Sequence, residues 1–266
     1  MAKISGINYG IVLSILTILV VILYFLSEYL QQPEVPVVPA LVINLDHRTD
    51  RLEEIKKEFQ IWTSPIERIS AVKKSPGWKG CSESHLKCVR IAKERRYPWV
   101  LIIEDDCILT EGGDKRYLRI LPYLWANKHK WDIFNGGVHF ISEFKIVDKE
   151  QQIFEVRAVA NHFYIVNSTA YDKILQDHPV LPEEPIDVFY QKYKNWTITP
   201  AIAAQRPSIS DIENKKEDYT QGLKDTDIIL TNFVQKNIIP DNFNLNAEGR
   251  AIRLKDAPEI IYSKAL

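Results

Sequence analysis

Cysteine is scarce in this sequence, and the three cysteines show neither a metal-binding nor a disulfide pattern. Cys81, Cys88 and Cys107 are odd in number, and their spacing is not that of a zinc motif. Cys81 and Cys88 would lie at the start of and along one helix. At about 1.5 Å per residue, their Cα atoms would be roughly 10 Å apart, which is too far for a disulfide. We therefore expect buried free thiols.

An excess of either charge is also lacking. The 266 residues contain 34 Lys and Arg against 35 Asp and Glu, so the formal net charge is −1 and no overall field attracts nucleic acid or an anionic surface. Internal repeats and low-complexity tracts are absent from the sequence. A hydrophobic content of 45%, with 12 Tyr, 10 Phe and 6 Trp, predicts a globular protein.

One stretch near the N-terminus lacks charge altogether. From Ile4 to Ser27 no charged residue occurs, and a membrane-spanning helix needs about 20 predominantly apolar residues. A cleaved signal peptide is the alternative, but Glu28-Tyr29-Leu30 follows where a small-residue cleavage site would be expected. Lys3 before the span and Glu28 after it favour a cytoplasmic N-terminus. The sequence thus predicts an uncleaved, single-pass type II anchor.

This interpretation divides the chain into three segments. Residues 1–30 form a cytoplasmic tail and transmembrane anchor, residues 31–40 with three prolines form a stiff stem, and residues 41–266 form one α/β domain. The domain would face the Golgi or endoplasmic reticulum lumen in a eukaryotic or viral protein. In a bacterium it would be held at the inner membrane.

The first part of the domain alternates between two periodicities. Apolar runs at 40–45, 66–72 and 99–105 predict strands, and the stretches between them, 46–59 and 82–96, have helical spacing or end before a proline. This order predicts a mostly parallel central sheet with right-handed crossovers. Further helices are expected at 114–128, 168–177 and 185–194, and further strands near 143–148, 153–166 and 196–202, with WDIFNGG (131–137) between the first of these helices and the next strand. The polar tail after Asp211 has no clear pattern.

Three consecutive acids follow the third predicted strand, in LIIEDDCIL (101–109). Strand alternation places Glu104 and Asp106 on one side and Asp105 on the other. Their mutual repulsion and desolvation must be offset by solvent, by cationic side chains or by a hard cation such as Mg²⁺ or Mn²⁺. A solvated strand-to-loop junction remains the simple alternative. An aspartyl phosphatase would need Asp in place of Glu104.

Seven stretches, in this order and spacing, carry a resemblance to a known family: VINLDHRTDR (42–51), GCSESHLKC (80–88), LIIEDDCIL (101–109), DIFNGG (132–137), YIVNSTAYDKIL (164–175), PIDVFY (185–190) and QRPSISDIE (205–213). They resemble glycosyltransferase family 25, the lipooligosaccharide and collagen galactosyltransferases. The chain departs from the family pattern at Trp78-Lys79, where an acid often precedes the Gly-Cys element, and at Val188, where an aromatic residue is expected. The loop 73–79 also lacks the usual Asp-Gly.

The resemblance implies a GT-A (Rossmann-like) fold, a UDP-sugar donor, a divalent cation (Mn²⁺ or Mg²⁺) and inverting chemistry. In such a reaction one base deprotonates the acceptor hydroxyl while the cation stabilises the departing diphosphate. The activity implied is transfer of galactose or glucose to a glycan or glycoprotein hydroxyl at a membrane, as in lipopolysaccharide biosynthesis. Nucleic acid is not an expected partner.

The resemblance also assigns candidate donor-site residues. Asp106 is the first choice for metal ligand, and Glu104 and Asp105 would share metal and ribose contacts. The remaining candidates are Asn44, Arg48 and Arg51 at or after the first strand, and Ser84 and His85, which would open a helix whose backbone N–H groups favour anions. For Arg51 a helix-surface ion pair with Glu54 or Glu58 is the alternative.

Asp187 is the candidate catalytic base or acceptor-binding acid, and a helix N-cap is its alternative role. His162 could line the cleft, although a core histidine is the simpler interpretation. Gly136-Gly137 would either approach the sugar or turn the chain.

Two other function classes compete with the glycosyltransferase hypothesis. One is a catalytically inactive glycosyltransferase-like module that binds glycan or protein partners at a membrane, against which the intact acids argue. The other is a metal-dependent hydrolase that uses the same acids.

Overall fold

The computed structural model describes residues 9–31, 34–60, 62, 66–159, 161–177, 184–211 and 215–254. The chain divides into two compact units, residues 1–36 and 37–266. The first contains helix α1 (Tyr9–Gln31). Among the described residues no helix is both long and apolar enough to cross a membrane, so the predicted span is not found there. Residues 4–8 of that prediction lie outside the described residues.

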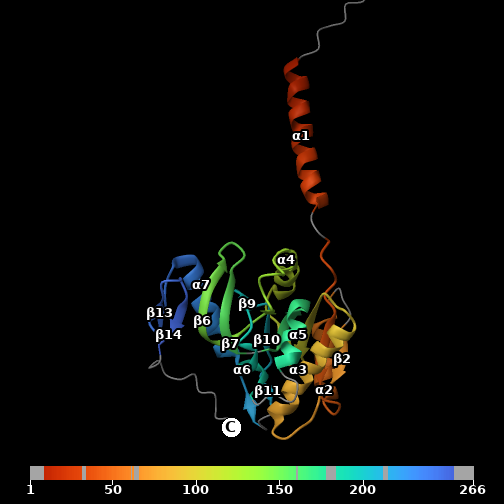
Figure 1. The fold of residues 1–266 in the computed structure, drawn as a ribbon, viewed down its shortest axis with the longest axis vertical. Helices are drawn as coiled ribbons and strands as arrows, with labels where there is room; N and C mark the ends of the chain where they lie inside the picture. The colour runs from red at the N-terminus through yellow and green to blue at the C-terminus, as the bar shows by residue number, and fades with distance from the viewer. Residues whose placement is uncertain are drawn as a thin grey trace, which may run out of the picture. The chain divides into compact units, whose positions relative to one another are not determined.

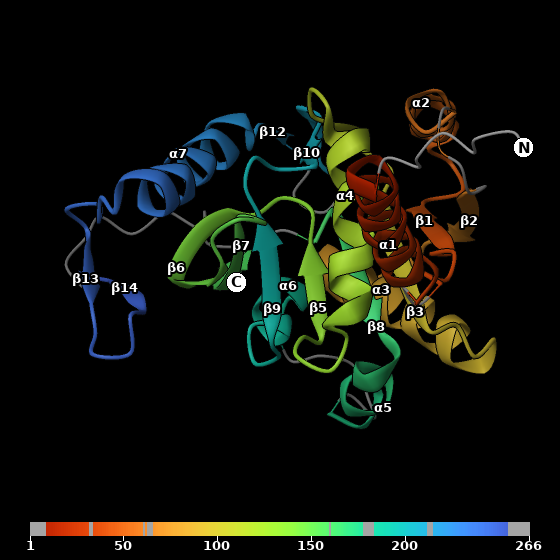
Figure 2. The same ribbon diagram turned by 90° about the horizontal axis from the view of Figure 1, so that it is seen from above.

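The second unit is built on a ten-stranded sheet with the order β13-β14-β6-β7-β9-β5-β8-β3-β1-β2 (Figures 1 and 2). Its strands are β1 (Ala40–Asn44), β2 (Ile66–Ser70), β3 (Trp99–Glu104), β5 (Ile133–Asn135), β6 (His139–Asp148), β7 (Ile153–Val159), β8 (Phe163–Asn167), β9 (Asn195–Ile198), β13 (Phe243–Leu245) and β14 (Ala251–Arg253). Two small sheets pair β4 (Cys107–Leu109) with β10 (Ala203–Gln205), and β11 (Ser208–Ile209) with β12 (Lys216–Glu217).

The sheet is mixed, so the predicted mostly parallel arrangement is wrong. Three neighbouring pairs, β1–β2, β1–β3 and β5–β9, run parallel. The other neighbours are antiparallel, because β6 and β7 form a hairpin and β8 enters between β5 and β3 in the opposite direction. The α/β class and the parallel order of the first three strands are confirmed. The predicted strand 153–166 is in fact two strands, β7 and β8.

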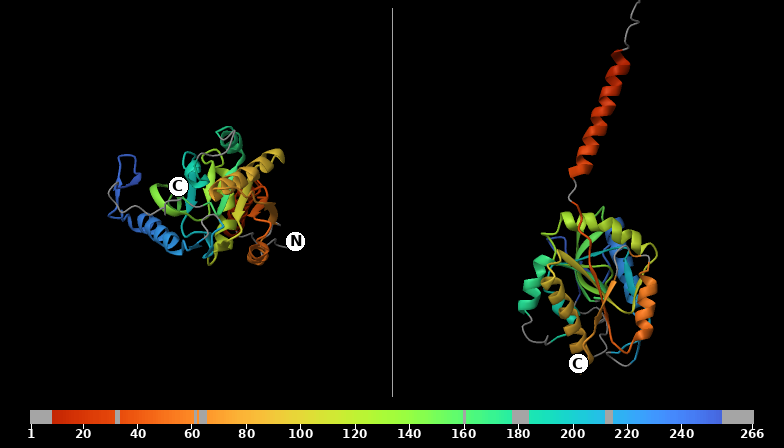
Figure 3. Two further views of the ribbon diagram at one scale, coloured as in Figure 1. Left: turned by 90° about the horizontal axis from the view of Figure 1, so that it is seen from below. Right: turned by 90° about the vertical axis from the view of Figure 1, so that its right-hand side faces the viewer.

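Helices cover both faces of the sheet near β3. The helices of this unit are α2 (Thr49–Glu58), α3 (Gly77–Glu94), α4 (Gly113–Ala126), α5 (Ser168–Asp177), α6 (Ile186–Tyr190) and α7 (Thr220–Lys236). One face packs Val100 and Ile102 of β3 against α3, α5 and α6. On the other, Phe59 after α2 and Tyr117 of α4 pack around Phe163 of β8. Figure 3 shows α3 (yellow) and α5 (green) opposite α2 (orange). This double coverage explains the nearly continuous apolar sequence of β3.

Two helices differ from the sequence expectation in ways that matter for the site. Helix α3 begins at Gly77, directly after Pro76, rather than near residue 82. Helix α7 lies in the polar tail that showed no pattern, and its Leu230 and Phe233 pack with Phe144 in a second apolar core. The three cysteines are free, as expected.

Candidate functional site

The acids lie where the carboxyl ends of the parallel strands β1 and β3 meet. The register pairs Ile43 with Glu104, so the next residue of each strand, Asn44 and Asp105, come side by side. Asn44 Nδ2 donates a 2.7 Å hydrogen bond to Asp105 Oδ2. Asn44 is buried, so the predicted candidate is part of the acidic cluster.

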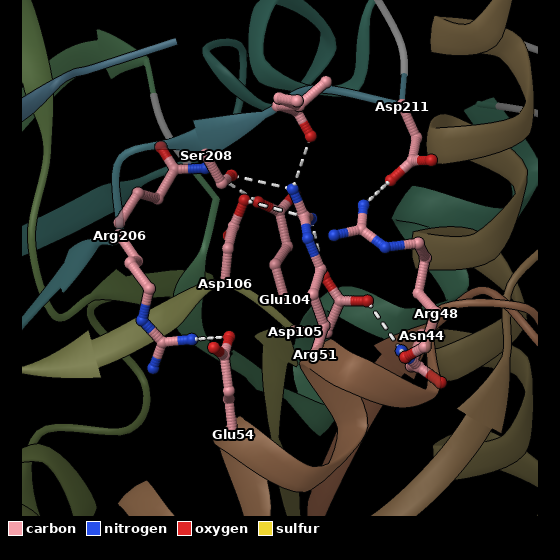
Figure 4. Close-up of polar contacts among 12 residues, drawn as sticks. Asn44, Arg48, Arg51, Glu54, Glu104, Asp105, Asp106, Arg206, Ser208 and Asp211 are labelled. Atoms are coloured by element: carbon pink, nitrogen blue, oxygen red, sulfur yellow. Dashed lines mark hydrogen bonds and ion pairs between the residues drawn. The ribbon is translucent and has the colours of Figure 1, made fainter. Parts of the chain in front are cut away.

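Arg51 is the cation that partly neutralises this cluster. Its Nη1 lies 2.9 Å from Asp105 Oδ1 and 3.4 Å from Asp106 Oδ2 (Figure 4). The side chain is only 9% exposed, and its Nη2 donates to Ser208 Oγ and to the Ile209 carbonyl at 2.7 and 2.8 Å. Arg51 therefore points inward from α2.

The predicted alternatives for these residues are not what the structure shows. Glu54 pairs with Arg206, and Glu58 accepts a hydrogen bond from the Leu109 amide, so neither forms the surface ion pair considered for Arg51. The alternation that should separate Asp105 from Asp106 also fails. Strand β3 ends at Glu104 and the next two residues form a turn, so one guanidinium reaches both carboxylates.

Asp106 retains one carboxylate oxygen without a partner. Its side chain is 16% exposed, and buried Oδ1 has no hydrogen bond among the described residues. Burial, with the nearby charge of Glu104, raises the pKa of Asp106 to about 7, although Arg51 opposes the shift. Burial also raises the pKa of Asp105. A buried carboxylate oxygen without a hydrogen-bond donor fits the oxygen-rich ligand set of a hard divalent cation.

Glu104 faces a different set of partners. Its Oε1 lies 3.1 Å from His85 Nε2, and its Oε2 accepts a 3.0 Å hydrogen bond from Gln205 Nε2. Burial acts to raise the pKa of Glu104, but the hydrogen bond and charge of His85 outweigh it, so the pKa is lowered. Gln205 reaches the acids because β10 pairs with β4, the strand that directly follows them.

The segment after β10 lies across the acidic strand end and is held there by α2 and the loop before it (Figure 4). The Arg206 amide donates to the Asp106 carbonyl at 2.7 Å. Arg48 pairs with Asp50 and with Asp211, so in the structure its guanidinium binds carboxylates. Gln205 and Arg206 were not among the predicted site residues, since only the distant pairing of β10 with β4 brings them here.

Ser84 and His85 do not open a helix, which corrects the predicted anion site. Helix α3 starts several residues earlier, so their backbone N–H groups lie inside the helix. Ser84 Oγ donates to the Gly80 carbonyl at 2.7 Å and accepts from the Val72 amide at 2.8 Å, a structural role. Only the His85 side chain reaches the acids.

Asp187 lies in the first turn of α6 but does not cap it, since Pro185 is the N-cap residue and the cap lacks a side-chain hydrogen bond. Its Oδ1 accepts a 2.6 Å hydrogen bond from Asn161 Nδ2. Burial, then the charge of Glu104, raises the pKa of Asp187 to about 6, while His85 lowers it. Asp187 therefore belongs to the electrostatic surroundings of Glu104 and His85.

The remaining candidates are structural. His162 is fully buried and stacks on His139 with ring centroids 5.4 Å apart, but neither ring nitrogen has a hydrogen-bond partner among the described residues, so it is a core histidine that is not satisfied as expected. A Cβ at Gly136 would lie 2.4 Å from Phe163 Cδ1, and one at Gly137 would lie 2.2 Å from the Ala203 carbonyl oxygen. These glycines allow close packing within the fold.

Comparisons with known proteins do not assign a family. No family model matches the chain, and no curated protein matches it. Solved structures are similar to parts of it, and three of them are described below. A Bacillus anthracis protein assigned as a glucose-1-phosphate thymidylyltransferase is 10% identical, with a TM-score of 0.34, and the match covers 71% of this chain and 75% of that one.

Two further structures have similarly low identities and TM-scores. For mannose-1-phosphate geranyltransferase from Thermus thermophilus the identity is 8% and the TM-score 0.33, over 66% of this chain and 57% of that one. HddC from Yersinia pseudotuberculosis is 15% identical, with a TM-score of 0.33, and the match covers 77% of this chain and 84% of that one. Structural similarity this weak does not indicate a function, so the function must be inferred from the residues of the site.

Proposed function

We propose that this chain is an inverting glycosyltransferase that moves a hexose, galactose or glucose, from a UDP-sugar to a hydroxyl of a glycan or glycoprotein. The observation that carries the proposal is the buried Oδ1 of Asp106, which lacks a hydrogen-bond partner within the described part of the chain and lies beside the Arg51-bridged acids. The seven motifs that resemble glycosyltransferase family 25, and with it a GT-A fold, support the same conclusion. Two of them contribute Asn44, Arg51 and the acids themselves.

The location favours a nucleotide ligand. In open α/β sheets, ligands bind beyond the carboxyl ends of the strands, which is where Asn44 and Asp106 lie. Arg48 and Arg51 approach this edge from the loop after β1 and from α2. Planar guanidinium groups bind phosphate oxygens in a bidentate manner, so these two residues are suited to a diphosphate.

A divalent cation, Mn²⁺ or Mg²⁺, would be held by Asp106, with Asp105 next to it. When bound, the cation would stabilise the negative charge of the departing diphosphate. Glu104 was expected to share the cation, but its pairing with His85 and Gln205 favours the two aspartates. Asn44 holds Asp105 in place.

Asp187 would act as the base that accepts the proton of the acceptor hydroxyl. A pKa of about 6 leaves it mostly ionised at neutral pH yet more basic than an ordinary aspartate. Asn161 orients the carboxylate with its 2.6 Å hydrogen bond. The membrane location predicted from residues 4–27 stays a prediction.

A catalytically inactive binding module is the second candidate. The pairing of both aspartates with Arg51, and its bonds to Ser208 and Ile209, favour this candidate, because they supply a cation from the protein itself.

Release of UDP from UDP-galactose and UDP-glucose, with Mn²⁺ and a mixture of sugar acceptors, tests the proposal. We expect acceptor-stimulated release that is lost with EDTA and reduced at least about 100-fold by Asp106→Asn and by Asp187→Asn. Asp241→Asn, at an exposed acid in the turn after α7, should leave the rate unchanged.

The absence of release by an intact, folded protein would favour the binding module. Release that is equally fast without acceptor would indicate a hydrolase instead.

A further inference from the structure

Three potential metal ligands, one of which is the first of the three acids, converge between α3 and the end of β3. Cys81, His85 and Glu104 each place one ligand atom so that the three atoms lie within 4.8 Å of one another. Cys81 and His85 are four residues apart on α3, so they share one face of the helix. Glu104 meets this face from the end of β3.

The distances match those of two ligands on one metal ion. His85 Nε2 and Glu104 Oε1 are 3.1 Å apart. Two ligand atoms at about 2.0 Å from a tetrahedral zinc ion are about 3.3 Å from each other, so this pair already has nearly the required separation. A thiolate at about 2.3 Å from the same ion would lie about 3.5 Å from the imidazole nitrogen, which rotation of the short Cys81 side chain can provide.

Further hydrogen bonds orient these ligands. His85 Nδ1 lies 2.7 Å from the Tyr164 hydroxyl, which turns Nε2 towards Glu104. Gln205 Nε2 donates to the second oxygen of Glu104 at 3.0 Å. Contacts of this kind to the outer atoms of histidine and carboxylate ligands are typical of metal sites, where they fix the tautomer and the orientation.

We propose that Cys81, His85 and Glu104 bind a thiophilic divalent cation, Zn²⁺ by preference, at a site distinct from the cation site on Asp106. A thiolate and an imidazole select zinc over Mg²⁺ or Mn²⁺, whereas Asp106 and Asp105 offer only oxygen. Three protein ligands leave the fourth position of a tetrahedral zinc site for water. Binding releases the Cys81 thiol proton to solvent, and His85 ligates as the neutral imidazole.

The site would fasten α3 to the end of β3. The metal would join Cys81 and His85, near the beginning of α3, to Glu104, the last residue of β3. The spacing Cys-x3-His with a distant Glu does not match a sequence motif for zinc, which is why the cysteine pattern alone did not predict it. The inference does not depend on the glycosyltransferase proposal.

Titration of the metal-free full-length protein with Co²⁺ tests this site, because tetrahedral cobalt and its thiolate bond have distinctive absorption bands. We expect one equivalent to produce both the tetrahedral bands and the near-ultraviolet thiolate band, and Zn²⁺ to displace it. Cys81→Ser should abolish the thiolate band. Tyr164→Phe should retain it but weaken binding about 10-fold, since only the orienting hydrogen bond is lost.

Cys88→Ala is the control, because Cys88 lies on the same helix but packs in the apolar core and is not part of the Cys81, His85 and Glu104 group. It should keep both bands, as should Asp106→Asn, which separates this site from the donor site. A thiolate band that survives Cys81→Ser, or that disappears equally in Cys88→Ala, would overturn the proposal.

X-ray absorption of the Zn²⁺-loaded wild-type protein gives the ligand set without any substitution. The expected result is one sulfur with two or three nitrogen or oxygen neighbours. A spectrum with nitrogen and oxygen only, or a protein that takes up no zinc, would contradict the assignment.

Discussion

The two ends of the central sheet bury different kinds of side chain. At the β1–β3 end, Arg51, His85 and Asp105 are buried among other polar groups. At the β6–β14 end, Phe144 and Phe154 pack with α7 in an apolar core. The core of the second end is therefore made of apolar side chains, whereas its ion pairs, such as Arg250 with Glu155, are more exposed than the pair of Arg51 with Asp105. The first end has an apolar core of its own around Leu41 and Val100 and buries the polar cluster in addition, which is typical of a functional site.

The largest loss of stability should come from the apolar end. Phe144 is fully buried and contacts Phe154, Phe233 and Phe243 edge to face. Phe144→Ala should lower the free energy of unfolding by about 4 kcal/mol, measured by urea denaturation, because it leaves a cavity. Phe144→Leu should cost about 1 kcal/mol. Equal losses from both variants would show that this core is loosely packed.

Removal of the cation at the polar end should have a slightly smaller effect. Arg51→Ala leaves the Asp105 and Asp106 carboxylates without their ion pair, so we expect a loss of about 3 kcal/mol in the same assay. Arg250→Ala, which breaks the more exposed pair with Glu155 at the other end, should cost about 1 kcal/mol. A loss from Arg51→Ala no larger than that from Arg250→Ala would remove the distinction between the two ends.

The pH dependence of stability should reveal Asp106. Its folded pKa of about 7 is above the unfolded value of about 3.9, so the folded state binds more protons between these values and stability falls as the pH rises from about 4 to 7. Asp106→Asn has no such proton to lose. Its unfolding free energy relative to wild type should therefore rise by on the order of 4 kcal/mol between pH 4 and 8. A difference independent of pH would mean that Asp106 titrates normally.

The smallest effect should come from the surface contact between the two segments that frame the acids. Arg206 pairs with Glu54, which is half exposed, so Arg206→Ala should change the free energy of unfolding by no more than about 0.5 kcal/mol. The measurement is again urea denaturation, with Glu54→Ala as the reciprocal variant. A loss comparable to that of Arg51→Ala would show that the 205–211 segment is fastened mainly at its edge.

The sequence predicted the local features of the polar end and missed the contacts that cross the chain. The apolar run before Glu104 and the helical spacing of α2 are properties of short windows, and both elements are where they were expected. The inward direction of Arg51 depends on Ser208, more than 150 residues away, and the position of Gln205 depends on strand pairing. Such contacts have no signature in a short window.

The same reason explains the errors in the rest of the fold. The sequence of β8 predicts an apolar strand but not that it runs antiparallel to β3 and β5. The periodicity and composition of a strand do not show in which direction its neighbours run. Helix α7 was not recognised, since its buried positions, such as Leu230 and Phe233, are diluted by many polar residues.

The most direct test of a donor site at the carboxyl end of β3 is calorimetric titration of UDP into the full-length protein in the presence of Mn²⁺. If Asp106 holds the cation of a donor site, UDP should bind only with Mn²⁺. Asp106→Asn should weaken this binding at least about 10-fold, and Asp241→Asn should not change it. UDP that binds Asp106→Asn as tightly as wild type, or that does not bind the folded wild-type protein, would contradict a donor site at the carboxyl end of β3.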